Sequence, residues 1–200
     1  MNIFTDDEAW IASYFELGIY YKHLDIEKKC LIFEALLKHA GIDGYFLYRD
    51  QEPSAQQKIE IRTLEFERCV FATIPVKNDT MPISINTIYL TEESQFWLDI
   101  SIPIGSLQRV FNMGGYPFGG TPEQHPKNWL PEVFSIFENF ASVVYESLPF
   151  QYAEIGNEID MEFRSESSIQ NERVGGFYFQ KHDGLIYYPP TFLDHHAKSS

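Results

Sequence analysis

Residues 95–104 alternate, residue by residue, between two kinds of side chain, and this pattern constrains the fold more strongly than any other. Successive side chains of a β-strand point to opposite faces, so a period of two predicts an antiparallel strand with one buried face. Residues 83–90 precede it across a short turn at 91–94, and the two segments together predict a β-hairpin. The predicted buried face carries Phe96, Leu98, Ile100, Ile102 and Ile104, and the opposite face carries Gln95, Trp97, Asp99 and Ser101.

Two segments in the first fifth of the chain predict helices. Thr5 and Glu8 have the spacing of a capping box, which predicts a helix that continues to about Glu16. Asp25 is a second N-cap candidate and Gly41 stands where a C-cap glycine belongs, so the residues between them predict another helix. Its apolar stripe is expected to contain Leu31, Ala35 and Leu36, widened by Ile32 and Leu37.

The later part of the chain predicts one more helix and further strands. Residues 131–148 carry apolar side chains at helical spacing. Residues 158–164 alternate as a strand does, and residues 174–188 predict a second hairpin with Asp183-Gly184 in its turn. The long helix is expected to bury Phe134, Phe137, Ala141, Val144 and Leu148.

The order of these elements indicates an α+β fold. Helices and strands do not alternate regularly, as they would in a doubly wound sheet. We therefore expect a mostly antiparallel sheet with helices packed on one face. No linker rich in Gly, Pro or Ser divides the chain, so residues 1–190 are expected to form a single domain and residues 191–200 a flexible C-terminal tail.

The charge of the chain is strongly negative and unevenly distributed. The formal net charge is −14, which disfavours nucleic acid and anionic membrane surfaces and favours basic partners. Between residues 131 and 172 there are nine acidic residues, and Arg164 is the only Lys or Arg. The acidic residues are Glu132, Glu138, Glu146, Glu154, Glu158, Asp160, Glu162, Glu166 and Glu172.

The remaining composition predicts a cytoplasmic protein with reduced thiols. Cys30 and Cys69 are too few for a disulfide framework and each lies next to an apolar run. The first residues lack the basic and apolar regions of a signal peptide, and no apolar run approaches the length of a membrane span.

The familiar motifs of catalysis and cofactor binding are missing. The glycine-rich stretch 114–120, GGYPFGG, lacks the Lys and the Ser or Thr of a phosphate-binding loop. No H-E-x-x-H, C-x-x-C or G-x-S-x-G motif occurs, and His195 and His196 have no third metal ligand fixed nearby. We therefore expect no cofactor and no metal.

The acidic residues Glu158, Asp160 and Glu162 are spaced by two, so an extended segment would place all three on one face, about 6.6 Å apart. Three interpretations stay open. In the first, the row is a solvated strand face. In the second, the row binds a cation, or one of its carboxylates has a raised pKa and serves in acid/base catalysis. In the third interpretation it binds a basic partner, which relieves the repulsion among like charges.

Aromatic residues add candidate contacts. Trp97, beside Asp99, is either an exposed anchor for a partner or is covered by a helix or loop. Tyr116 and Phe118 form the tip of a loop flanked by glycine pairs, which either contacts a partner or plugs Phe118 into the core.

The leading hypothesis is a non-enzymatic, acidic protein-binding module with a basic protein partner, such as an immunity-type inhibitor of a basic toxin or nuclease. The first alternative is a small carboxylate-based hydrolase or metal-dependent enzyme, in which Glu154, Glu158 and Asp160 would converge in one cleft. The second alternative is a structural homo-oligomer. The predicted partner-binding residues are Glu154, Glu158, Asp160, Glu162, Trp97, Asp99, Tyr116 and Phe118.

Overall fold

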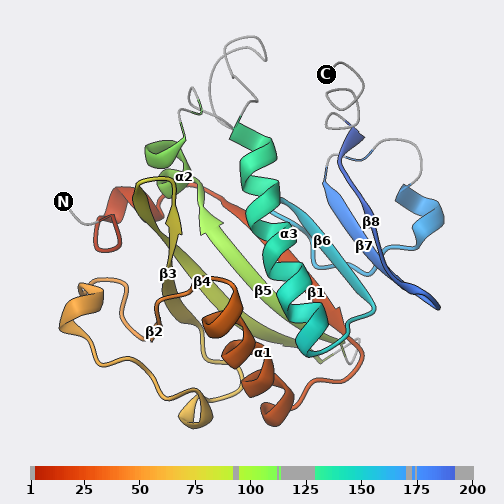
Figure 1. The fold of residues 1–200 in the computed structure, drawn as a ribbon, viewed down its shortest axis with the longest axis horizontal. Coiled ribbons are helices and arrows are strands. Elements are labelled where there is room, and N and C mark those ends of the chain that lie inside the picture. Colours follow the sequence, from red (N-terminus) through yellow and green to blue (C-terminus); the bar gives the residue numbers. More distant parts are fainter. Residues whose placement is uncertain are drawn as a thin grey trace.

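An eight-stranded antiparallel sheet forms the centre of the computed structural model, which describes residues 3–91, 95–111, 113, 129–169, 173 and 175–191 (Figure 1). The strand order is β2-β3-β4-β5-β1-β6-β7-β8. The first strand along the chain therefore lies in the middle of the sheet, between β5 and β6. The strands are β1 (Tyr14–Tyr21), β2 (Tyr45–Phe46), β3 (Val70–Val76), β4 (Asp79–Leu90), β5 (Gln95–Pro103), β6 (Tyr152–Asn157), β7 (Gly176–Lys181) and β8 (Gly184–Tyr188).

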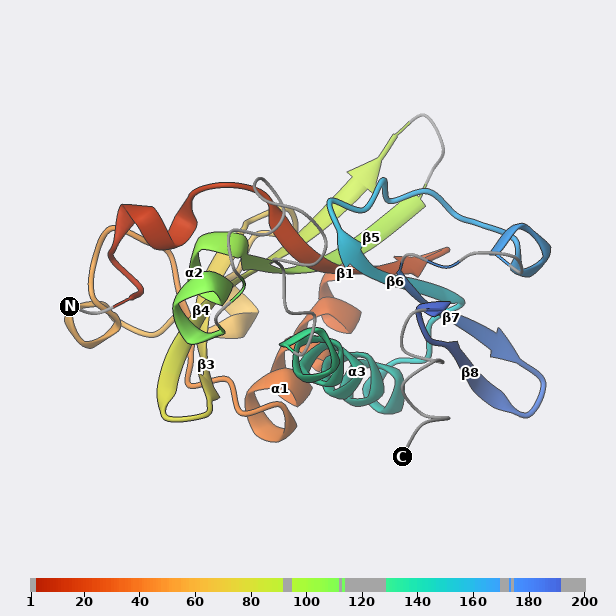
Figure 2. The ribbon, with the colours of Figure 1, turned by 90° about the horizontal axis from the view of Figure 1, so that it is seen from above.

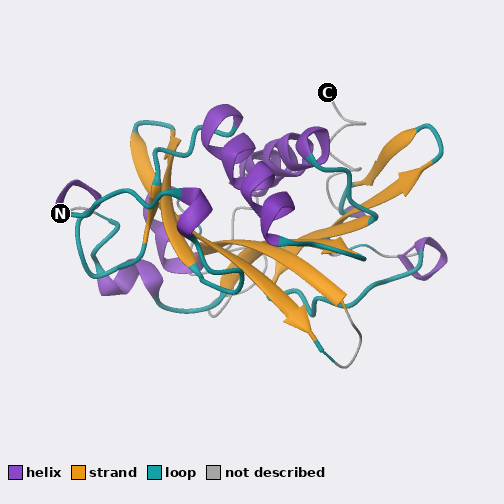
Figure 3. Ribbon diagram, turned by 90° about the horizontal axis from the view of Figure 1, so that it is seen from below, coloured by secondary structure: helices purple, strands orange, loops and turns teal. Residues whose placement is uncertain are grey.

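The two longest helices lie together on one face of this sheet (Figures 2 and 3). Their apolar side chains join those of the strands in the main hydrophobic core. The predicted α+β class, with a mostly antiparallel sheet and helices on one face, is therefore confirmed. The helices are α1 (Ile26–His39), α2 (Ile104–Val110) and α3 (Leu130–Ser147), and the described 3-10 helices are η1 (Asp7–Trp10), η2 (Pro53–Ala55), η3 (Ile61–Thr63) and η6 (Glu166–Ile169).

Helix α1 begins and ends as predicted but turns a different side to the core. The Asp25 side chain accepts a hydrogen bond of 2.9 Å from the backbone N–H of Lys28, and Gly41 follows the helix with a φ of +75°. Leu31, however, is 51% exposed, so the predicted stripe is wrong at that position. The buried side of α1 consists of Lys29, Ile32, Phe33 and Leu36.

The predicted helix from Thr5 to Glu16 is wrong. Only one 3-10 turn, η1, forms there, and Glu16 lies within strand β1. Asp6 caps that turn by accepting a hydrogen bond from the N–H of Glu8, while the Thr5 hydroxyl donates to Glu52. The helical signal was local, whereas β1 pairs along both of its edges, with β5 and β6, and this tertiary pairing outweighs the local signal.

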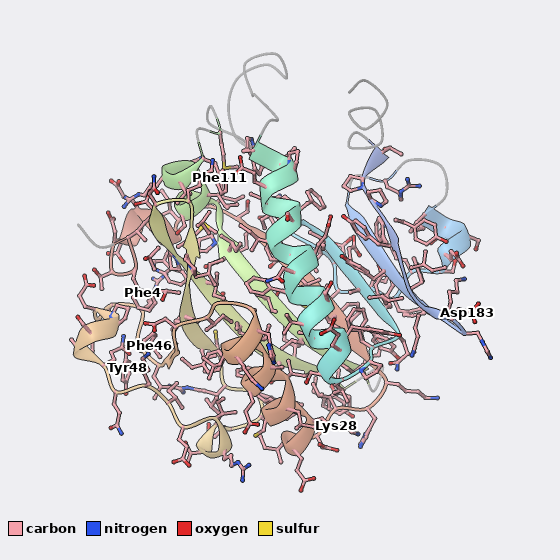
Figure 4. The ribbon with its side chains drawn as sticks, in the orientation of Figure 1. Phe4, Lys28, Phe46, Tyr48, Phe111 and Asp183 are labelled. Atoms are coloured by element: carbon pink, nitrogen blue, oxygen red, sulfur yellow. The ribbon has the colours of Figure 1, made fainter. Side chains whose placement is uncertain are left out.

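Both predicted hairpins and the long helix are confirmed. β4 pairs with β5, and β7 pairs with β8 around a turn whose Asp183 lies at the tip of the hairpin (Figure 4). In α3 the predicted Phe134, Phe137, Ala141 and Val144 are buried, whereas Leu148 follows the last residue of the helix and is only half-buried. Among the described helices, none has the length and apolar character needed to cross a membrane.

Candidate functional site

The face of the sheet opposite α1 and α3 has a polar centre. Strand register places Asn86, Asp99, Gly18 and Glu154 next to one another on β4, β5, β1 and β6. Glu16 lies two residues from Gly18 on β1 and therefore on the same face. Three carboxylates thus gather on the central strands of this face, while their sequence neighbours Leu17, Leu98 and Ile155 point into the main core.

The chain passes over this polar centre in an irregular segment, Glu158–Arg164, which we call the strap. Figure 2 shows the chain between β6 and η6 on the side of the sheet away from α1 and α3. The predicted strand at 158–164 is wrong, because β6 ends at Asn157 and both Glu158 and Met161 have a φ of +51°. This left-handed conformation interrupts the extended chain, so the alternating sequence does not form a ladder.

One apolar side chain anchors the strap to the sheet. Ile159 lies over Gly18 and Gly156, where a Cβ atom at Gly18 would come within 2.5 Å of Ile159 Cδ1 and one at Gly156 within 3.1 Å of Cγ2. The backbone N–H of Ile159 also donates a hydrogen bond of 2.9 Å to the Glu16 carboxylate. The two glycines therefore form a notch that lets the strap approach the sheet closely.

The three acidic residues of the strap point to solvent even though no strand forms. Glu158, Asp160 and Glu162 are exposed, whereas Ile159 and Met161 are half-buried. Phe163, which follows them, is 47% exposed. Its ring nevertheless contacts the rings of Tyr20 and Tyr152, with centroid distances of 5.2 Å and 5.3 Å. The strap therefore presents exposed carboxylates and part of an aromatic ring on one segment.

A pocket of about 300 Å³ opens beside the strap and brings three of the predicted residues together. Glu154, Glu158 and Asp160 all line it, as does Arg164. Glu162 is absent from the residues that line it. The convergence of the first three residues is the geometry that the enzyme hypothesis requires, and it also creates an acidic depression for a basic side chain.

Arg164 partly neutralises this pocket. Its Nε lies 3.6 Å from Glu154 Oε2, and its Nη2 lies 3.3 Å from Asp160 Oδ2. Tyr152 also donates a hydrogen bond of 2.9 Å to Glu154. Burial nevertheless raises the pKa of Glu154, because the residue is only 7% exposed and burial disfavours its charged form. The arginine balances one charge, so the pocket keeps an acidic excess.

The pattern of the sequence missed Glu16 and placed Asp99 on an exposed surface. Asp99 is buried, and its Oδ2 accepts a hydrogen bond of 2.6 Å from the Ser101 hydroxyl. Burial raises the pKa of Asp99 to about 6. Burial, reinforced by the nearby charge of Asp99, raises the pKa of Glu16 to about 7. The alternation places Asp99 on the polar face of its strand, and a polar face is normally exposed to solvent. The alternation cannot show that a distant segment of the chain covers that face.

Trp97 is also buried, so of its two predicted environments the covered one is correct. None of its surface is exposed, and its ring lies 5.6 Å from that of Tyr20 and 6.1 Å from that of Tyr152. It belongs to a second hydrophobic cluster on the outer face of the sheet. Tyr116 and Phe118, the remaining predicted contacts, lie outside the described residues, as do residues 192–200 of the predicted tail.

Within the described part of the chain, no group of three or more His, Cys, Asp and Glu side chains is arranged to hold a metal ion. Cys30 and Cys69 are free thiols and half-buried. Comparison of the chain with protein-family models, with curated proteins and with solved structures gave no match. The geometry of the strap and its pocket therefore carries the functional proposal.

The raised pKa values of Glu16 and Asp99 predict a pH-dependent stability. Each group binds its proton more tightly in the folded chain, so the free energy of unfolding should fall as pH rises from about 5 to 7.5. Asp6, Asp25 and Glu166 have lowered pKa values, so they change the free energy of unfolding only at pH values below this window. Urea denaturation at several pH values measures the slope. Glu16→Gln should flatten the slope above about pH 6, where Asp99 no longer contributes, and an equal slope there in this variant would contradict the assignment.

Proposed function

We propose that this chain is a non-enzymatic, acidic protein-binding module that acts in the cytoplasm and engages a basic protein partner through the strap. The observation that carries the proposal is the position of the carboxylates of Glu158, Asp160 and Glu162. All three are exposed on one irregular segment beside an acidic pocket. Such a surface attracts a cationic partner at long range and selects against acidic ones.

The chemistry of the strap favours arginine or lysine side chains of the partner. A guanidinium or ammonium group entering the pocket would meet Glu154, Glu158 and Asp160, and Arg164 would repel it only in part. The exposed part of the Phe163 ring offers a cation–π contact on the same segment. An immunity-type inhibitor that neutralises a basic toxin or nuclease is the specific form of this proposal, because such a partner presents a basic surface to be masked.

Charge reversal tests the proposal. The partner is captured from a lysate of the native host, identified by mass spectrometry and purified, and its affinity is measured by calorimetry. Replacing Glu158, Asp160 and Glu162 by Lys should weaken Kd roughly 100-fold, since three ion pairs contribute about 1 kcal/mol each. The affinity of the wild-type chain should also decrease as the salt concentration rises.

A matched variant separates a local contact from the effect of net charge. Glu27, Asp50 and Glu67 are exposed and lie far from the strap in sequence, and replacing them by Lys changes the net charge by the same amount. This variant should retain Kd within about tenfold of the wild type, because it leaves the strap ion pairs intact. The proposal fails if both variants lose affinity equally, or if no basic protein is captured.

A carboxylate-based hydrolase is the second candidate, and the convergence of Glu154, Glu158 and Asp160 in one pocket favours it. A carboxyl group with a raised pKa, such as that of Glu154, suits general acid catalysis. The two candidates differ in their response to Glu154→Gln. An enzyme would lose turnover of its substrate in this variant, whereas a binding module would keep most of its affinity because the exposed strap carboxylates remain.

A further inference from the structure

We infer that the pocket beside the strap is a site for one arginine side chain of the partner, and that Arg164 is an internal occupant which the incoming guanidinium displaces. The inference rests on the proposed function, because it names the side chain that the basic partner presents to this pocket. It adds two properties to the acidic surface: a preference for arginine over lysine, and competition between the partner and the chain's own arginine.

Glu154 supplies a buried carboxylate that the chain itself leaves incompletely paired. The residue is 7% exposed and lines the pocket, and its Oε2 accepts the hydrogen bond from Tyr152. Its other oxygen, Oε1, accepts no hydrogen bond from the described part of the chain. A buried carboxylate oxygen without a donor costs free energy, and a charged donor removes that cost. A cationic side chain entering the pocket would supply the missing donor.

Arg164 occupies this position only loosely. Its Nε lies 3.6 Å from Glu154 Oε2, too far for a hydrogen bond, and this buried Nε–H has no acceptor among the described residues. The guanidinium makes one hydrogen bond there, of 3.3 Å, from Nη2 to Oδ2 of the exposed Asp160. A strong arginine–carboxylate pair is instead bidentate, with two parallel hydrogen bonds. The Arg164 side chain is already 37% exposed, so its displacement toward solvent disturbs little packing.

The walls of the pocket favour a guanidinium over an ammonium group. Phe177 and Ile169, each 5% exposed, line the pocket together with the carboxylates. A guanidinium is planar and weakly hydrated, so it packs against apolar surface while its edge binds a carboxylate. An ammonium group is strongly hydrated and loses that water against the same surface. The side chains of Glu154 and Asp160 are 9% and 74% exposed, and carboxylates at two depths suit the several N–H donors of one guanidinium.

NMR titration of the full chain with three small compounds tests the site in the absence of the partner. The compounds are N-acetylarginine methylamide, its lysine counterpart and its citrulline counterpart, which has the shape of arginine without the charge. The arginine compound should cause saturable shifts at the amides of Ile169 and Phe177, with an affinity at least about fivefold above that of the lysine compound. Equal affinity for arginine and either other compound, or no saturable shift with arginine, would overturn the inference.

Removing the internal occupant tests the competition. In Arg164→Gln the arginine compound should bind about tenfold more tightly, because no guanidinium has to leave the pocket first. Arg62→Gln removes the same charge at an exposed position outside the pocket and should tighten binding by less than about twofold. If both variants tighten binding equally, Arg164 is not an occupant of the site.

The wild-type chain provides a second readout of displacement if Arg164→Gln does not fold. The Nε–H resonance of Arg164 should move toward that of a solvent-exposed arginine as the arginine compound saturates the site. An unmoved resonance at saturation would overturn the displacement.

The two proposals fail separately. If the arginine compound binds as expected but no basic protein is captured, the pocket is an arginine site and the proposed function fails. If a captured basic protein loses affinity on charge reversal of the strap but the arginine compound does not bind, the proposed function stands and this inference fails.

Discussion

Replacing Trp97 by alanine is expected to lower the free energy of unfolding by about 3–5 kcal/mol, because a large ring in a packed cluster leaves a cavity when it is removed. Trp97 is fully buried and contacts Tyr20 and Tyr152 on the outer face of the sheet. Urea denaturation followed by circular dichroism measures the change. Trp97→Phe should cost clearly less, since a smaller ring still fills part of the space.

Phe163→Ala provides the matched control for this prediction. Its ring contacts the same two tyrosines but is 47% exposed, so removing it should cost about 1 kcal/mol. Equal losses for Trp97→Ala and Phe163→Ala would mean that the outer cluster is not a packed core. A Trp97→Ala chain of wild-type stability would contradict the burial of the indole directly.

Replacing Lys29 by alanine is expected to cost about 2–4 kcal/mol, because it removes both a packed side chain and a buried hydrogen-bond donor. The ammonium group of Lys29 donates to the carbonyls of Glu65 and Phe66, the first at 2.9 Å. It also lies 5.2 Å from the centroid of the Phe33 ring. Burial lowers the pKa of this lysine to about 8, so the group stays largely charged at neutral pH.

Two variants separate the contributions of Lys29. Lys29→Met keeps the aliphatic stem but leaves the two carbonyls without this donor, so its cost should fall between zero and that of Lys29→Ala. Lys38→Ala, at an exposed position of the same helix, should change stability by less than about 0.5 kcal/mol. Denaturation at constant pH measures all three variants. If Lys29→Ala behaves as Lys38→Ala does, the lysine does not hold the 65–66 segment against α1.

The sequence predicted the elements whose signals are local and repeated. The alternation of residues 95–104 predicted β5, and the spacing of Phe134 and Phe137 predicted α3. It did not predict which polar residues would be buried. Asp99 lies on the face of the sheet opposite α1 and α3, which would be exposed if helices alone covered the sheet. The strap and the second hydrophobic cluster lie over that face, so Asp99 is buried.

The errors arose where distant segments decide the conformation. At Glu16 the local capping signal favoured a helix, and only pairing with β5 and β6 makes this residue part of a strand. At Glu158 the alternation favoured a strand, but the hydrogen bond from Ile159 goes to the Glu16 carboxylate. The exposure of the three strap carboxylates was nevertheless predicted, because charge alone keeps them in water.

The position of β1 in the middle of the sheet has a consequence for how the chain folds. Tyr14 pairs with Pro103 and Phe15 pairs with Asn157, so the two edges of β1 close loops of 89 and 142 residues. Loops of this length delay pairing, and folding slows as contacts become more distant in sequence. During synthesis β1 emerges before both of its neighbours, and β6 follows only after all the elements between them have been made. Until then β1 is an apolar strand with two unpaired edges, which can pair with the wrong strands. Delayed release of the nascent chain would protect β1 from such non-native pairing.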